Sequence, residues 1–126
     1  MEILHTPIGE KVMRIDMGTE LSPDKKSVLG SVELDIENQS EFVDTISAIF
    51  EAGKINIIVN LGNITYIDSS GLWALFEGHK KALQRNGTLM LLNPTKDVKR
   101  VLDITKMSSK LKIFADQETA IAELNK

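Results

Sequence analysis

Residues 55–72 read INIIVNLGNITYIDSSGL and place three structural signals in a row. Ile55–Leu61 is a nearly continuous apolar run, which is typical of a central strand in a parallel sheet because both faces of such a strand are covered. A short loop follows. The Asp-Ser-Ser-Gly sequence at 68–71 then supplies side chains that favour helix N-termini. The stretch therefore predicts a buried strand that leads through a loop into a helix over residues 70–86.

The predicted helix carries an apolar stripe that we expect to face the core, and Asn86-Gly87 is expected to end it. The stripe comprises Leu72, Leu75, Phe76, His79 and Leu83. His79 is expected to be a buried or half-buried histidine with its hydrogen bonds satisfied, rather than a ligand. Trp73 lies off this stripe, on the side of Glu77 and Lys80, and is expected to be an exposed interface residue.

The second half of the chain alternates between apolar strands and amphipathic helices. Strands are predicted at Leu89–Leu92 and Lys112–Phe114, and a short helix is predicted between them around Val98–Leu102. Asp116 is expected to cap a terminal helix that ends near Leu124. Alternation of this kind gives parallel neighbouring strands joined by right-handed crossovers.

The first half is less regular. Val28–Ile36 alternates between apolar and polar residues and predicts one half-buried strand. A helix is predicted over residues 38–52, with Asn38 and Glu41 as a capping box and Gly53 as its C-terminal cap. The remaining features are a candidate strand at 11–15 and a turn-rich loop at 18–26.

The predicted fold class is a single α/β domain with a mixed, mostly parallel sheet of four to five strands. One or two strands from the first half are expected to pair antiparallel at an edge. The helices are expected to pack mainly on one face.

Composition excludes several classes of function. The chain has 126 residues and a net charge of −3, without the basic surplus or dense Lys/Arg run that nucleic-acid binding favours. It has no cysteine, and its two histidines, His5 and His79, make a His-rich metal site improbable. No signal peptide or membrane-spanning run is found. We therefore expect a cytoplasmic protein with no cofactor, metal, nucleic acid or membrane partner.

Ser69 lies where functional residues of open α/β sheets gather, between a strand end and a helix start. The simplest interpretation is that Asp68, Ser69 and Ser70 only cap the helix. A hydroxyl at this place would also suit phosphorylation, because free backbone N–H groups and the helix dipole stabilise a phosphate. The charge of about −1.5 to −2 that it adds could abolish an association without unfolding the domain.

Four motifs in order resemble the STAS domain of bacterial anti-sigma factor antagonists. They are VELD at Val32–Asp35, IVNL at Ile58–Leu61, IDSSGL at Ile67–Leu72 and VKRVLD at Val98–Asp103. The resemblance covers residues 28–124 and implies one STAS domain over residues 1–126. Residues 1–26 would then form an N-terminal strand and loop extension.

The resemblance implies a phosphorylation-controlled binding module. The unphosphorylated protein would bind an anti-sigma factor that is also a serine kinase and so free a sigma factor. Phosphorylation of Ser69 would break the complex, and a metal-dependent serine phosphatase would reverse it. The expected partner-binding residues are Asp35, Asp68, Ser70, Gly71 and Trp73. We expect a monomer or a weak dimer.

This chain departs from the usual family pattern at Val32, where a glycine is usual, at Trp73, where a small residue is common, and at 106–109, where Gly-Leu is frequent. The departures leave the partner's identity open. The main alternative is a STAS scaffold or docking subunit of a stressosome-type or membrane-transport complex, with a silent serine. An enzyme with Ser69 as nucleophile is disfavoured, because G-x-S-x-G and a base near Ser69 are absent. We expect no enzymatic activity and no catalytic residue.

Overall fold

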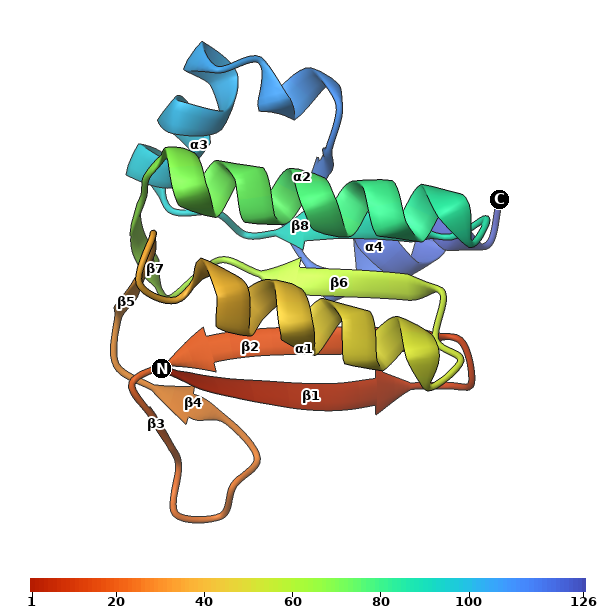
Figure 1. Ribbon diagram of the computed structural model, residues 1–126. Helices are drawn as coiled ribbons and strands as arrows, with labels where there is room; N and C mark the ends of the chain where they lie inside the picture. The colour runs from red at the N-terminus through yellow and green to blue at the C-terminus, as the bar shows by residue number, and fades with distance from the viewer.

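A five-stranded sheet forms the centre of the computed structural model, which describes all residues 1–126 (Figure 1). The strand order is β1-β2-β6-β8-β9. The strands are β1 (Glu2–Ile8), β2 (Val12–Gly18), β6 (Asn56–Asn60), β8 (Thr88–Leu92) and β9 (Lys112–Phe114). β1 is antiparallel to β2, and all other neighbours are parallel. The predicted α/β class and mostly parallel sheet are confirmed.

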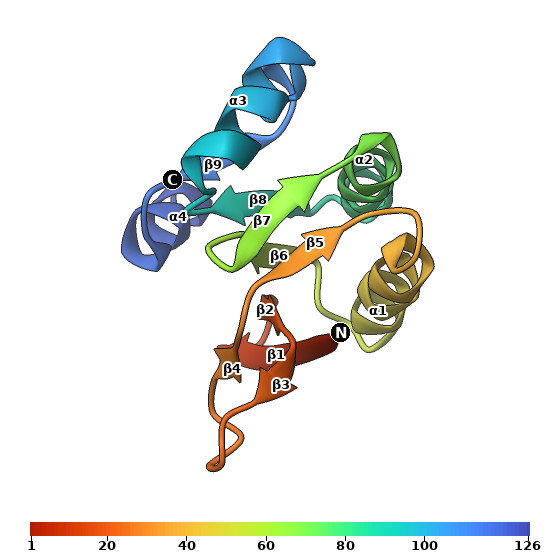
Figure 2. The same cartoon turned by 90° about the vertical axis from the view of Figure 1, so that its left-hand side faces the viewer.

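Four helices surround this sheet. Figure 2 shows α1 (Gln39–Glu51) and α2 (Ser69–Gln84) side by side on one face, with α4 (Gln117–Leu124) on the other. α3 (Lys96–Ile104) lies beyond the end of the sheet. The main core lies under α1 and α2, as expected for helices mainly on one face, and a smaller cluster lies under α4. The smaller cluster consists of Ile58, Met90, Leu92 and Ala120.

A separate pair of parallel strands lies at the end of the main sheet, where Figure 2 shows β5 (Val32–Leu34) beside β7 (Ile64–Ile67). The segment that becomes β7 was predicted to be a loop, and this prediction is wrong. Its four residues become a strand because Val32 and Leu34 offer a partner edge from more than 25 residues earlier in the chain. β7 leads directly into α2, so this pair positions the start of that helix.

The predicted single strand at Val28–Ile36 is also wrong. β4 (Val28–Leu29) pairs antiparallel with β3 (Glu20–Leu21), and the chain then turns at Gly30 before β5 begins. Gly30 has a φ of +83° and lies against the side chain of Thr19, so a side chain there would be strained and would overlap.

The N-terminal residues contribute more to the sheet than the sequence predicted. β2 extends beyond the predicted strand at 11–15 and pairs in parallel with β6, inside the main sheet. β1, which was not predicted, is the antiparallel edge strand, with Pro7 near its end. Residues 1–26 therefore supply two of the five strands rather than an appendage.

The predicted buried stripe of α2 is right only in part: Leu72 packs against the main core and Phe76 is half-buried. Leu75 is buried as expected, whereas Leu83 is 57% exposed. The buried face instead consists of Gly71, Ala74, Leu75, Gly78 and Ala82. These small residues let α2 pack closely on its neighbours: a methyl group at Gly78 would lie only 2.7 Å from Cδ1 of Leu89. His79 is half-buried, as predicted, but its Nδ1 has no hydrogen-bond partner, so the expectation of a satisfied histidine is wrong.

The caps predicted at Gly53 and Asp116 agree with the structure. Gly53 has a φ of +100° just after α1, and the Asp116 side chain accepts a hydrogen bond from the Thr119 N–H at 2.8 Å. The capping box of Asn38 and Glu41 is wrong. The Asn38 side chain instead closes the turn before α1, accepting from the Asp35 N–H at 2.9 Å and donating to the Glu33 carbonyl at 2.6 Å.

Candidate functional site

Asp68 caps the N-terminus of α2. Its Oδ1 accepts a hydrogen bond from the Gly71 N–H at 2.9 Å, and its carbonyl accepts from the Leu72 N–H at 3.0 Å. Ser69 is therefore the first residue of the helix. Within the first helical turn this leaves the N–H groups of Ser69 and Ser70 without a partner in the helix, and they point at the region in front of it.

Asp68 also joins α2 to the turn between β5 and α1. Its Oδ2 accepts from the Ile36 N–H at 3.3 Å, and its own N–H donates to the Leu34 carbonyl at 3.3 Å. One carboxylate thus holds two segments that are 32 residues apart in sequence. The starts of α1 and α2 are brought together by this contact.

Ser69 is exposed and lies in a hollow between the two helix starts. The hollow has a volume of about 350 Å³ and is lined by Gln39, Ser69, Ser70 and Trp73. Ser70 is half-buried, and Trp73 is 50% exposed, as predicted from its place off the apolar stripe. The Oε1 atom of Gln39 is buried and has no hydrogen-bond partner.

The N-terminus of α2 favours a negative charge at the Ser69 hydroxyl. The helix N-terminus carries roughly half a positive elementary charge, and α2 has no acidic residue within its first turn. A phosphate on Ser69 would meet the free N–H groups of this turn. The only carboxylate beside it in sequence, Asp68, already has both oxygens engaged.

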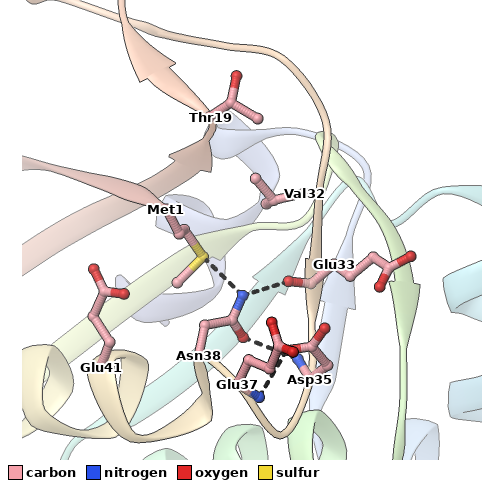
Figure 3. A pocket seen from close by; sticks show the side chains of 8 residues that line it. All are labelled: Met1, Thr19, Val32, Glu33, Asp35, Glu37, Asn38 and Glu41. Atoms are coloured by element: carbon pink, nitrogen blue, oxygen red, sulfur yellow. Dashed lines mark hydrogen bonds between the residues drawn. The ribbon is translucent and has the colours of Figure 1, made fainter.

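Asp35 lies in a neighbouring groove rather than in the hollow around Ser69. It is half-buried, and its Oδ1 accepts from the Glu37 N–H at 3.0 Å. The groove has a volume of about 570 Å³ (Figure 3). Its lining residues are Met1, Thr19, Val32, Glu33, Asp35, Glu37, Asn38 and Glu41. Four of these eight side chains are acidic.

Gly71 does not have the position expected of a partner-binding residue. It is buried, and a methyl group on it would overlap the carbonyl oxygen of Leu34. Its role is to let α2 approach β5, because only glycine fits this backbone contact. The prediction that Gly71 contacts a partner is corrected accordingly.

The structure contains no group of three or more His, Asp or Glu side chains that could hold a metal ion. None of its helices has the length and apolar character needed to cross a membrane. His79 contacts the Phe76 ring, with ring centroids 5.9 Å apart, and does not line the hollow around Ser69.

The comparison with protein families decides the classification, since residues 30–120 match the model of the STAS domain. The chain belongs to the STAS domain family. The matched STAS residues run from the turn at Gly30 into α4, so they include Asp35, Asp68 and the whole of α2.

Curated relatives carry regulatory names. The anti-sigma-B factor antagonist of Staphylococcus epidermidis is 33% identical over 94 residues, which span 74% of this chain and 86% of the relative. The protein of the same name from Staphylococcus aureus is 36% identical over 74 residues, 58% of this chain and 68% of the relative. These relatives are regulatory proteins and not enzymes, in line with the expectation from the sequence.

Solved structures share the whole STAS fold. A crystal structure of a candidate anti-sigma factor antagonist from Thermotoga maritima matches with a TM-score of 0.80 at 22% identity, over 98% of this chain and 95% of the other. SpoIIAA in its unphosphorylated form matches with a TM-score of 0.75 at 19% identity, over 98% and 96%. The phosphorylated form of Bacillus SpoIIAA matches with a TM-score of 0.66 at 22% identity, over 98% and 99%. These matches include the N-terminal strands that precede the matched family residues.

Sequence reasoning missed two residues of the site, Gln39 and Ile36. Ile36 lies in the turn after β5, and Gln39 is the first residue of α1. The sequence predicted the end of β5 only approximately. An apolar residue between two acidic ones, as in Asp35-Ile36-Glu37, was the available signal for Ile36. Nothing in the sequence distinguished Gln39 from an ordinary residue at a helix start.

Proposed function

We propose that this STAS domain is an anti-sigma factor antagonist controlled by phosphorylation of Ser69. Without phosphate, it binds an anti-sigma factor that is a serine kinase, and a sigma factor is released. The kinase then transfers a phosphoryl group to the Ser69 hydroxyl, the complex separates, and a metal-dependent serine phosphatase restores the binding form.

The observation that carries this proposal is the position of Ser69. It is the exposed first residue of α2, beside the capping Asp68, and it shares a hollow with the half-exposed Trp73. A kinase can therefore reach its hydroxyl without unfolding the domain. The names of the curated relatives support the same function.

The effect of the phosphate follows from its surroundings. The free N–H groups at the start of α2 stabilise the dianion, so the fold is retained. An interface that covered this hollow would have to bury a charge of about −1.5 to −2, which is costly unless the partner supplies matching donors. Partner contacts from Asp35, Ser70 and Trp73, around the Asp68 cap, would be lost together.

The test is incubation of the purified protein with the candidate anti-sigma kinase of the same genome and ATP, followed by intact-mass analysis and site mapping. We expect one added phosphate on Ser69. Ser69→Ala should stay unmodified and should bind the kinase permanently, whereas the matched variant Ser70→Ala should still be phosphorylated. Phosphate on Ser70 or Thr65, with Ser69→Ala still modified, would show that the assignment is wrong. Binding without any phosphorylation would favour a scaffold.

A further inference from the structure

The apolar side chain of Ile36 is exposed to solvent. It is 71% exposed, although it lies only two residues after Leu34, the fully buried last residue of β5. Its backbone is not free, because its N–H donates to Oδ2 of Asp68. The backbone at Ile36 is therefore held beside the start of α2.

The same carboxylate sets the position of Ile36 relative to Ser69. Asp68 caps α2 through Oδ1 and holds Ile36 through Oδ2, and Ser69 is the next residue in the chain. Ser69 also shares its hollow with Trp73. Two exposed apolar side chains therefore belong to the surroundings of Ser69: Trp73 through the shared hollow, and Ile36 through the contact of its backbone with Asp68.

The surface around Ile36 is acidic. Between Ser27 and Gly53 the chain has six acidic residues and no lysine or arginine. Glu33, Glu37 and Glu41 are exposed, form no ion pair within the protein, and line the groove of Figure 3 together with Asp35. Long-range attraction would therefore steer a positively charged surface to this side of the molecule.

We infer, on the basis of the proposed function, that Ile36 is an apolar anchor for the anti-sigma factor and that Asp68 is the residue that positions it. The complementary surface of the anti-sigma factor carries an apolar side chain that covers Ile36 and Trp73. Lysine or arginine side chains beside it enter the acidic groove of Glu33, Asp35, Glu37 and Glu41.

This arrangement explains how a phosphate can dissociate a partner that is itself basic. The phosphate would lie in the hollow beside Trp73, where the partner has to exclude water, rather than in the open acidic groove. Desolvation of the dianion then outweighs its long-range attraction for the partner. Phosphorylation acts in the part of the interface from which water is excluded. The acidic groove raises the rate at which the basic partner associates.

The experiment measures the affinity of the unphosphorylated protein for the purified anti-sigma factor of the same genome by titration calorimetry. Ile36→Ser should weaken binding by about tenfold or more, as expected for loss of an interface anchor. Ile104→Ser is the matched control, because Ile104 is 72% exposed on α3 and lies outside this surface. It should bind within about twofold of the unchanged protein, since it removes an equally exposed isoleucine elsewhere.

Asp68→Asn tests the positioning role. Asparagine is also a good helix cap, but it has one acceptor oxygen and cannot keep both bonds. We expect nearly unchanged stability in urea with several-fold weaker binding. Asp116→Asn, at the cap of α4, should change neither. Raising NaCl from about 50 to about 500 mM should weaken binding of the unchanged protein.

The outcomes separate the two proposals. Failure of the unchanged protein to bind the anti-sigma factor would overturn the proposed function, and this inference with it. Normal binding by the unchanged protein together with equal binding by Ile36→Ser would overturn the anchor alone. Binding that does not respond to salt would overturn the basic character of the partner surface.

Discussion

Gly71 lies directly against the carbonyl oxygen of Leu34, so α2 begins in backbone contact with the end of β5. A methyl group at Gly71 would overlap this oxygen and would lie 2.7 Å from Cγ1 of Ile67. Backbone atoms cannot rotate away as a side chain can. At Gly78, two turns along the same helix, the nearest atom is Cδ1 of Leu89, the end of a flexible side chain.

These two glycines give a matched pair of predictions. Alanine favours a helix over glycine by about 1 kcal/mol, which acts equally at both positions. Overlap with backbone costs about 1–3 kcal/mol. Gly71→Ala should therefore lower the free energy of unfolding by up to about 2 kcal/mol, whereas Gly78→Ala should be close to neutral. Urea denaturation checks both, and equal effects at the two sites would contradict the role given to the Leu34 contact.

The sequence predicts best those elements that depend only on residues close together in the chain. β6 and β8 are apolar runs that are buried on both faces, and Gly53 and Asp116 act at helix ends through their nearest neighbours. β7 could not be predicted in the same way. Its partner β5 is about 30 residues away in sequence, and pairing with that strand is what makes it a strand.

The buried face of α2 was missed for a different reason. Hydrophobicity alone favours Leu83 for the buried face, whereas the fold needs small residues where helix and sheet approach closely. The spacing of Gly71, Ala74, Gly78 and Ala82 at three or four residues was the signal for this face. Ser69 and Trp73 were placed correctly because both depend only on the start and the rotation of one helix.

Ser69→Asp should separate the effect of charge on stability from its effect on binding. A carboxylate in the first turn of α2 interacts favourably with the helix dipole, so the free energy of unfolding should rise by about 0.3–1 kcal/mol. Binding to the anti-sigma factor should nevertheless weaken, because the charge lies where the contact forms. Ser69→Asn is the neutral control of similar size. Loss of stability in Ser69→Asp would show that the N-terminus of α2 does not favour an anion.

His79 should make stability depend on pH. Burial lowers the pKa of His79 below its usual value of 6.5, and the positive charge of Lys110 adds to this effect. Its Nδ1 is buried without a partner. Because the folded state favours the neutral imidazole, this contribution is complete above pH 6.5 and is lost as the pH falls through the lowered pKa of the folded state.

The measurement is the urea midpoint between about pH 5 and 8, the range in which histidines titrate. The unchanged protein should lose stability as the pH falls below 6.5, the usual value for histidine. In His79→Gln this loss should be smaller. His5→Gln, which changes the exposed histidine of β1, is the control. A pH dependence that persists unchanged in His79→Gln would assign it to other groups.

Trp73 should report partner binding by its fluorescence. It is the only tryptophan, so the emission comes from one place in the molecule. Because it is 50% exposed beside Ser69, the free protein should show red-shifted emission that iodide quenches. Emission should shift to the blue when the anti-sigma factor binds. The shift should be absent when Ser69 is phosphorylated.

Truncation of Trp73 distinguishes an interface residue from a core residue. Trp73→Ala should cost the folded protein no more than about 1 kcal/mol, since full burial of an aromatic side chain would cost about 3–5 kcal/mol on truncation. The same variant should weaken binding by about 2 kcal/mol, in the range of aromatic anchors. Leu83→Ala is the control on the same helix, because Leu83 is 57% exposed and lies outside the hollow around Ser69. Blue emission in the free protein, with a large loss of stability in Trp73→Ala, would place Trp73 in the core against α1 and would remove it from the binding surface.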